Sequence, residues 1–178
     1  MEELINELDK TTKELLDTID SFSQEQFNTI PFEGSWTAAQ VAEHLWKSES
    51  GIPQVVEGTS RPTTERQGDE KMEVIKSVFL DFTTKYASPE FILPSNERKE
   101  KGDLLKALKK TRGDIRTLTD TTDLSRTFTD FPLPQLGELT GWEWVCFAVC
   151  HSKRHIRQLK NIYAATAGKA AVQQSSQN

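Results

Sequence analysis

The stretch S-W-T-A-A-Q-V-A-E-H-L, residues 35–45, contains the clearest start of a helix in this sequence. Thr37 stands three residues before Gln40, a spacing that lets each side chain cap the backbone N–H of the other at a helix N-terminus. Trp36, just before the cap, is placed to close a hydrophobic staple over it. The stretch therefore predicts a helix over residues 37–50.

Four other segments repeat apolar side chains at the spacing of amphipathic helices. These predicted helices cover residues 2–22, 72–82, 103–118 and 138–165. Connections rich in polar residues or proline separate them at residues 58–69, 88–95 and 130–137, and the last is interpreted as a turn. We find no internal repeat, no Gly-rich phosphate loop and no convincing set of strands. We therefore expect an all-α four-helix bundle, up-down with one long connection, plus a short extra helix.

The composition limits the possible partners and the location. Lys and Arg number 22 against 27 Asp and Glu, which gives a formal net charge of −5. No cluster of cations is present to neutralise phosphates, so we expect no binding of nucleic acid. The longest uncharged apolar run, Trp144–Cys150, is far shorter than the roughly 20 residues of a membrane span. The acidic N-terminus also lacks the features of a secretory signal. We expect a cytoplasmic protein without a membrane partner, with one domain over residues 1–166 and a disordered tail over 167–178.

The chain has three histidines, His44, His151 and His155, and all fall on predicted helices. His151 and His155 lie four residues apart, so they project from one helix face at about 40° to each other. This spacing lets one helix offer two nitrogen ligands to a divalent metal. Three protein ligands leave an open site, whose reaction would start from a metal-bound water or thiol. Alternatively, His151 and His155 are surface residues near a basic helix end, where their charge interacts favourably with the helix dipole.

Helical rotation also selects the side chains that would share the face of these histidines. The candidates for a pocket or an outer shell around the metal are Gln40, Ser48, Trp144, Arg154 and Gln158. Small side chains at Ser48 and Gly51 could leave a hollow for a ligand. Arg154 could hold an anionic substrate group or a carboxylate of a partner, with a surface ion pair as the alternative. Cys146 and Cys150 are turned away from this face and are interpreted as packing residues. No side chain is identified as a general acid or base.

Two segments resemble the DinB-like superfamily. Residues 35–45 are similar to the Trp-Ser/Thr-x-x-Gln/Glu-x-x-x-His helix start of that family, and H-S-K-R-H-I-R-Q-L, residues 151–159, is similar to its His-x-x-Arg-His-x-x-Gln ending on the last long helix. The resemblance implies a four-helix bundle in which one histidine of the second helix and two of the last bind one divalent metal, commonly nickel, zinc or iron. On this sequence the ligands would be His44, His151 and His155. Members often form homodimers, so the resemblance also implies a homodimer.

The resemblance implies two classes of function. Better-characterised relatives are thiol-dependent S-transferases or isomerases that use a low-molecular-weight thiol, and others are described as metal-dependent hydrolases. Both would act on a small-molecule substrate, because a metal lowers the pKa of a bound thiol or water and so produces a nucleophile at neutral pH. The alternative is a helical dimer without turnover that acts as a stress-related binding or interaction protein. The lack of an identifiable acid or base favours this alternative.

Overall fold

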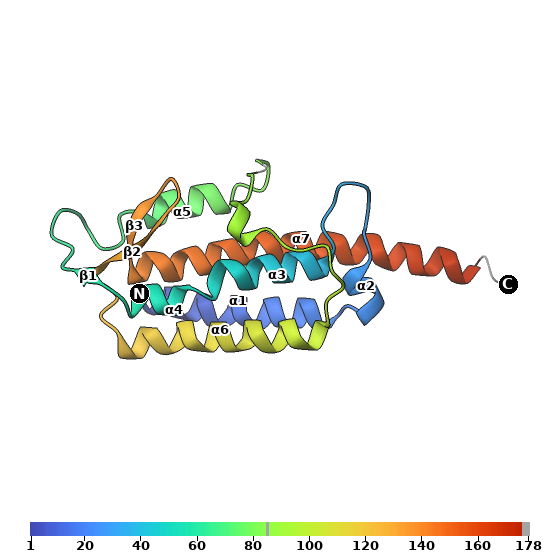
Figure 1. The fold of residues 1–178 in the computed structure, drawn as a ribbon, viewed down its shortest axis with the longest axis horizontal. Helices are drawn as coiled ribbons and strands as arrows, with labels where there is room; N and C mark the ends of the chain where they lie inside the picture. The colour runs from blue at the N-terminus through green and yellow to red at the C-terminus, as the bar shows by residue number, and fades with distance from the viewer. Residues whose placement is uncertain (85, 176–178) are drawn as a thin grey trace.

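Four long helices lie side by side and form the body of the protein (Figure 1). The computed structural model describes residues 1–84 and 86–175, with side chains described as far as residue 167. The long helices are α1 (Glu2–Asp20), α3 (Ala38–Glu49), α6 (Lys101–Thr121) and α7 (Gly141–Ser175). Both α1 and α3 pack against α6 and α7. The expected mainly helical four-helix bundle is thus confirmed.

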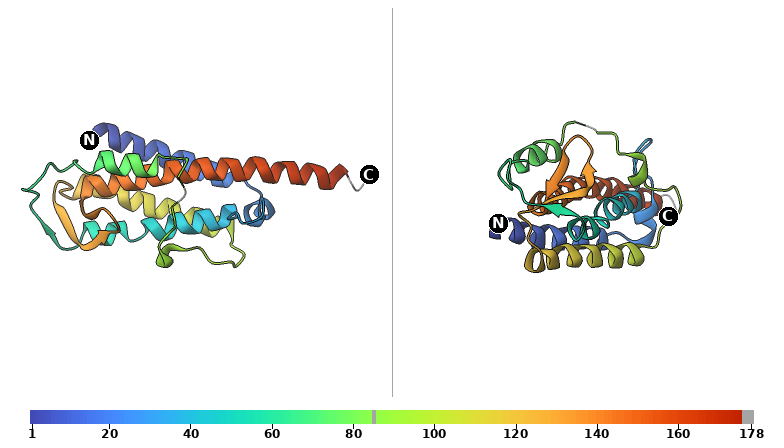
Figure 2. Two further views of the ribbon diagram at one scale, coloured as in Figure 1. Left: turned by 90° about the horizontal axis from the view of Figure 1, so that it is seen from above. Right: turned by 60° about the vertical axis from the view of Figure 1, so that its left-hand side comes forward.

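The direction of the helices requires one long connection. In Figure 1, α1 and α7 run one way, and α3 and α6 run the other way. Because α3 and α6 are parallel, the chain must return along the whole bundle between them. Residues 57–100 make this return, and they carry β1 (Ser60–Arg61), α5 (Met72–Phe79) and the 3-10 helix η1 (Glu90–Ile92). This connection lies over the α3 and α7 side of the bundle (Figure 2).

The start of α3 is the one predicted from the sequence. The Thr37 hydroxyl accepts a hydrogen bond from the Gln40 N–H at 3.1 Å, and Gln40 Oε1 accepts one from the Thr37 N–H at 2.9 Å. This reciprocal cap confirms the capping box. The helix ends at Glu49, and the short helix α4 (Ile52–Val56) follows. Proline in the first turn of α4 has no N–H to lose there, which explains why the chain breaks and restarts at this point.

A second capping box begins a short helix that the sequence analysis did not predict. Helix α2 (Gln24–Asn28) has Ser23 as its N-cap, and Gln26 completes the reciprocal pair of hydrogen bonds. The S-x-x-Q spacing was therefore available in the sequence as a signal. A five-residue helix carries no periodic apolar pattern, so the cap is its only sequence signature.

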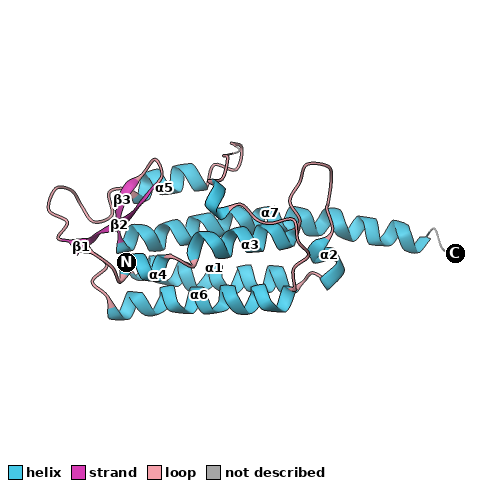
Figure 3. Ribbon diagram, in the orientation of Figure 1, coloured by secondary structure: helices cyan, strands magenta, loops and turns pink. Residues whose placement is uncertain are grey.

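Residues 127–140 form a β-hairpin, which corrects the predicted turn at 130–137 and the predicted helix start at 138. Strands β2 (Thr127–Leu133) and β3 (Gly137–Thr140) pair antiparallel, and β1 adds to β2 in the order β1-β2-β3 (Figure 3). Strand β1 pairs with β2 only through Thr127 and Phe128. The Thr129 N–H also donates to the carbonyl of Thr59. Beyond Thr129, no strand among the described residues pairs with this edge of β2, and proline is tolerated there because no ladder hydrogen bond is lost.

Helix α7 starts later and ends later than predicted. Thr140 and Glu143 form its capping box: the Thr140 hydroxyl accepts from the Glu143 N–H at 3.2 Å, and Glu143 Oε2 accepts from the Thr140 N–H at 2.9 Å. Glu143 is buried and also binds Arg66 in a bidentate ion pair. The helix continues to Ser175, past the other helices (Figure 1), although a disordered tail was expected from residue 167. Residues 176–178 lie outside the described part of the chain.

A layer of buried polar side chains divides the apolar core. In α1, α6 and α7, the residues of one apolar cluster lie on one side of this layer and those of a second cluster on the other. Helix α3 contributes only to the second cluster, and α4 contributes to the first. The polar layer consists of Thr11, His44, Glu49, Thr111, Arg112, His151, Ser152 and His155. All eight side chains are buried. Burying polar groups is costly unless they are paired, so the partners of these side chains determine what the layer does.

We predict that the start of α7 fits tightly, at Gly141, against Leu124 in the loop between α6 and β2. A Cβ atom there would lie 2.5 Å from Leu124 Cδ2 and 2.8 Å from Leu124 Cα. Gly141→Ala should therefore lower the free energy of unfolding by about 1–3 kcal/mol, as overpacking does. Gly113→Ala is the control: it lies within α6 with no atom near its Cβ position and should raise stability by about 0.5–1 kcal/mol. Urea unfolding measures both, and equal effects would contradict the packing.

Candidate metal centre

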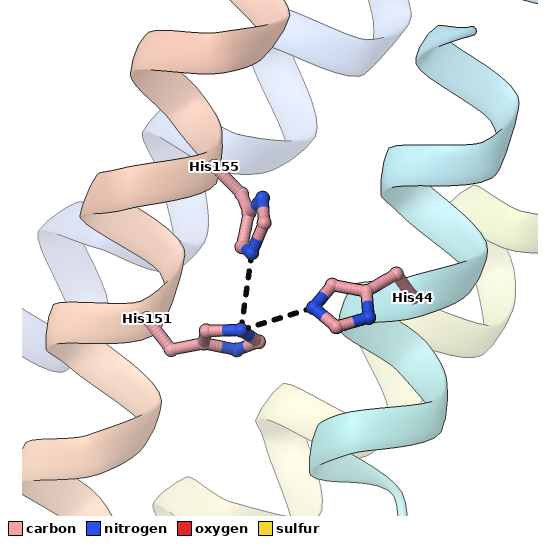
Figure 4. A group of neighbouring side chains, drawn as sticks. All are labelled: His44, His151 and His155. Carbon is pink, nitrogen blue, oxygen red and sulfur yellow. Dashed lines mark hydrogen bonds between the residues drawn. The ribbon is translucent and has the colours of Figure 1, made fainter. Parts of the chain in front are cut away.

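The three histidines meet inside the bundle (Figure 4). His44 projects from α3, and His151 and His155 project from α7 on consecutive turns. His151 Nε2 lies 3.2 Å from His44 Nε2 and 3.1 Å from His155 Nε2. All three side chains are buried, at 2%, 5% and 7% exposure. This placement is incompatible with the alternative in which His151 and His155 lie on the surface and interact with the helix dipole.

Hydrogen bonds at the outer nitrogens fix the proton positions of two of the rings. His44 Nδ1 lies 3.0 Å from the carbonyl oxygen of Ile92, and His155 Nδ1 lies 2.8 Å from Gln158 Oε1. Both oxygens can only accept, so each Nδ1 carries the proton of a neutral ring. The two Nε2 atoms are then unprotonated, with their lone pairs directed toward His151. Such outer acceptors typically orient histidine ligands of metals.

The converging nitrogens fit a divalent metal. A proton on His151 Nε2 can satisfy one of its two close contacts, whereas a cation at the meeting point satisfies all three rings. Nitrogen ligands about 2.0–2.1 Å from a metal, at angles between octahedral and tetrahedral, stand roughly 2.8–3.4 Å apart. The observed separations of 3.1 and 3.2 Å lie in that range. His44, His151 and His155 could therefore hold one metal ion.

The surroundings keep the imidazoles neutral, which is the form that binds metal. Burial is the main cause that lowers the pKa of all three. The positive charge of Arg154 adds to this effect on His151 and His155, and that of Lys47 adds to it on His44. Together these surroundings lower the pKa of His155 to about 3. An uncharged ligand set leaves the full charge of a bound dication uncompensated.

Aromatic rings fix the imidazoles from the sides. Phe147 stacks on His151 with ring centroids 5.2 Å apart and planes inclined by 13°, and Phe79 meets the same ring edge-on at 5.5 Å. Trp36 packs against His44 with centroids 5.1 Å apart. The sequence analysis placed Trp36 only in the staple over the helix cap. His151 Nδ1 has no hydrogen-bond partner among the described residues, so packing and the contacts of its Nε2 with the other two histidines orient this ring.

A cavity of about 550 Å³ opens onto all three histidines. Its walls come from α3, α4, α5, the residues around η1, the β2–β3 hairpin and α7. Aromatic residues in the wall are Phe79, Tyr86, Phe91, Phe131, Trp144 and Phe147. No carboxylate is found in the wall among the described residues. A pocket of this size and lining suits a small, largely apolar molecule.

The structure brings most of the expected outer residues to the site. Ser48, Trp144 and Arg154 line the cavity, as does Gly51. Gln158 contacts His155, as described above. Gln40 does not reach the site, which corrects its expected place: its amide is used in the cap of α3 and in a hydrogen bond to Asn96 Oδ1 at 3.0 Å. Helical rotation places Gln40 on the histidine face, but the cap directs its side chain along the helix end.

Arg154 and the cysteines take more specific positions than the sequence indicated. Arg154 Nη1 and Nη2 donate to the backbone carbonyls of Asp81 and Thr84, which fastens the loop after α5 to α7. No ion pair of Arg154 is found among the described residues.

Cys146 and Cys150 lie in one apolar cluster with their sulfur atoms 3.9 Å apart. They do not line the cavity, in agreement with a packing role.

The sequence analysis missed the part of the site that the long connection supplies. Ile92 provides the carbonyl that orients His44, and Phe91 forms part of the wall. The only signal was the pair of prolines around F-I-L in residues 88–95, which indicated an irregular, partly buried connection. Nothing in that pattern indicates which helix the segment covers.

We predict that Gln158 strengthens metal binding through His155. Gln158→Met keeps the length of the side chain but removes the acceptor for His155 Nδ1–H. Loss of such an outer partner lowers metal affinity by about 10–100-fold. Lys160→Met is the control, because Lys160 lies on the same helix and pairs only with the surface residue Glu14 in the described structure. Titration with zinc and a competing chelator measures both, and a Gln158→Met affinity within twofold of the original would contradict the role.

Comparison with known proteins agrees with the fold. No helix in the described part of the chain meets the length and hydropathy needed to cross a membrane. A search of curated proteins found no match. One solved structure that matches is YfiT from Bacillus subtilis, described as a probable metal-dependent hydrolase with an unusual four-helix bundle topology. The TM-score is 0.59 at 18% identity, with 93% of this chain and 87% of that chain covered. The model of the DinB superfamily matches residues 7–159, and the chain therefore belongs to the DinB superfamily.

Proposed function

We propose that this protein is a metal-dependent enzyme that acts on a small apolar substrate, with His44, His151 and His155 as the metal ligands. The observation that carries the proposal is the meeting of three buried Nε2 atoms, 3.1–3.2 Å apart along both contacts of His151, at the wall of a cavity of about 550 Å³. Nickel, zinc and iron all accept imidazole ligands. The description of YfiT as a probable metal-dependent hydrolase supports the same class.

The side chains of this protein would bind and orient the metal and the substrate. None of the described residues in the cavity wall is a carboxylate that could act as a base. A divalent metal held by three neutral imidazoles supplies a strong positive charge that lowers the pKa of a thiol or water in the fourth position. Ile92 and Gln158 hold two of the rings in the tautomer that presents Nε2. The aromatic wall excludes water and positions an apolar substrate. A thiol ionises far more readily than water, so a site without a base suits S-transfer from a low-molecular-weight thiol better than hydrolysis.

Metal content and turnover test the proposal together. Protein prepared without a His-tag should contain one equivalent of divalent metal. It should conjugate a chlorodinitrobenzene electrophile to at least one thiol from a panel of cysteine, glutathione and bacillithiol. His44→Ala should lose both metal and turnover. Hydrolysis of aryl esters without any thiol would instead identify a hydrolase. Absence of metal, or identical turnover in His44→Ala, would overturn the proposal.

A second candidate is a binding or interaction protein without turnover, which the absence of a general base in the described wall favours. One equivalent of metal combined with flat rates for every thiol and ester would support this candidate. Its test is therefore the same experiment.

A further inference from the structure

The cavity wall carries a positive charge that the described residues do not balance. Two cationic side chains line it, Lys47 and Arg154, and no carboxylate does so among the described residues. Lys47 is compensated: its ammonium lies 3.3 Å from Glu43 Oε1 and donates to the carbonyl of Leu93 at 2.8 Å. Arg154 contacts two carbonyl groups, which carry no net charge.

The acidic residue whose backbone Arg154 contacts, Asp81, forms no ion pair with it. The guanidinium binds the backbone carbonyl of Asp81, whereas the Asp81 carboxylate accepts hydrogen bonds from the hydroxyls of Thr83 and Thr84. The ring of Tyr86 lies under the guanidinium, 5.5 Å from it. A guanidinium has more N–H donors than two carbonyls use, so Arg154 keeps both charge and donors for a ligand.

We propose that the substrate of this cavity is an apolar organic anion whose charged group, such as a carboxylate or sulfonate, is held by Arg154. The inference rests on the proposed function in one respect, since it takes this cavity as the substrate site. Phe79, Trp144 and Phe147 contact the apolar body, and Arg154, three residues after His151, holds the charged end beside the metal ligands. Arginine suits this task because its planar fork matches the geometry of a carboxylate or sulfonate.

A matched pair of fluorescent probes tests the proposal without turnover. 8-Anilinonaphthalene-1-sulfonate and N-phenyl-1-naphthylamine share one aromatic skeleton and differ by the sulfonate. Both are titrated into the full chain in the presence of a chelator, so that the result does not depend on metal. The sulfonate should bind more tightly although it is the more polar molecule, and salt should weaken only its binding. Equal or weaker binding of the sulfonate would overturn the proposal.

Variants assign the charge effect to Arg154. Arg154→Met should weaken sulfonate binding about tenfold, the value of one charge-assisted hydrogen bond, and leave the neutral probe within twofold. Arg154→Lys keeps the charge and should retain most of the preference. Arg157→Met is the control, because Arg157 lies one turn away over the ring of Phe82, and it should change neither probe. Equal weakening of both probes in Arg154→Met would mean that Arg154 only fastens the loop, and would overturn the proposal.

A further variant locates the probes. A Cβ at Gly51 meets no atom within 4 Å, and Gly51 lines the cavity, so Gly51→Leu should fill part of it and weaken both probes. If neither probe responds, they bind elsewhere and the proposal fails. A failure of this proposal can be distinguished from a failure of the proposed function. The proposed function fails if the protein lacks metal or turnover, and neither result affects probe binding in the absence of metal.

Discussion

His151→Ala should lose more than 100-fold in affinity for a divalent metal. His151 is the central ring, since its Nε2 is the atom that both other histidines approach. Removal of an outer hydrogen-bond partner already lowers affinity by about 10–100-fold, and loss of a ligand must have a larger effect. The remaining pair, His44 and His155, comes from two different helices and keeps no shared partner.

The measurement is metal-dependent stabilisation. At free metal about 1,000 times the Kd of the original protein, that protein should gain about 4 kcal/mol in unfolding free energy, and His151→Ala should gain at most about 1.4 kcal/mol. Cys150→Ala is a suitable control, because it is the buried neighbour on the same helix and packs in an apolar cluster. It should lose stability without losing the gain from metal. A full metal-dependent gain in His151→Ala would show that the three rings do not share an ion.

Arg112→Met should lower the free energy of unfolding by about 3–5 kcal/mol, because it leaves Glu49 buried without its partner. Arg112 Nε lies 2.8 Å from Glu49 Oε2, and Nη2 lies 2.9 Å from Glu49 Oε1, with both side chains at 0% exposure. Arg112 also donates to the carbonyl of Ala148 at 3.0 Å and to the Ser152 hydroxyl. Arg112 thus joins α3, α6 and α7.

The loss should depend on pH in a defined direction. Burial raises the pKa of Glu49, and the charge of Arg112 opposes this rise. Without Arg112 the carboxyl is more stable protonated in the folded state. A raised folded-state pKa means that stability is highest below the unfolded value, about 4.3, and falls as pH rises through the folded value. The loss should therefore be larger at pH 8 than at pH 5.

Two controls complete the test. Arg116→Met removes an arginine of the same helix whose ion pairs with Asp9 and Asp120 are exposed, and it should cost at most about 1 kcal/mol. The double variant Arg112→Met with Glu49→Leu should recover most of the stability, because no charge is then left buried. If Arg112→Met alone is as stable as Arg116→Met, the Arg112–Glu49 ion pair contributes little to the free energy of unfolding.

The sequence predicted those parts that depend on local pattern. The cap at Thr37 and Gln40 located the start of α3, and apolar periodicity located the other long helices. The spacing of His151 and His155 placed two rings on one face, as the structure shows. Their meeting with His44 followed from a resemblance to a family rather than from spacing, because rotation on one helix contains no information about its neighbour.

The remaining features depend on tertiary contacts. The hairpin before α7 was missed because its proline residues indicate a turn, and only the Thr140–Glu143 capping box marks the true helix start. Rotation placed Gln40 at the site, but its amide is used in the cap. The carbonyl of Ile92 has no side-chain signature at all. Such a backbone acceptor becomes visible only when the path of residues 57–100 is known.

The polar layer has a consequence for how the helices align. Leu, Ile and Val side chains on neighbouring helices could interlock almost as well after a slip of one turn, because apolar contacts have little directional preference. A slip would separate Glu49 from Arg112 and would direct His44 away from His151, and each buried group would lose its partner. The layer thus fixes the register of the four helices along the bundle axis. The same polar interactions that set this register also hold the three imidazole rings at chelating distance.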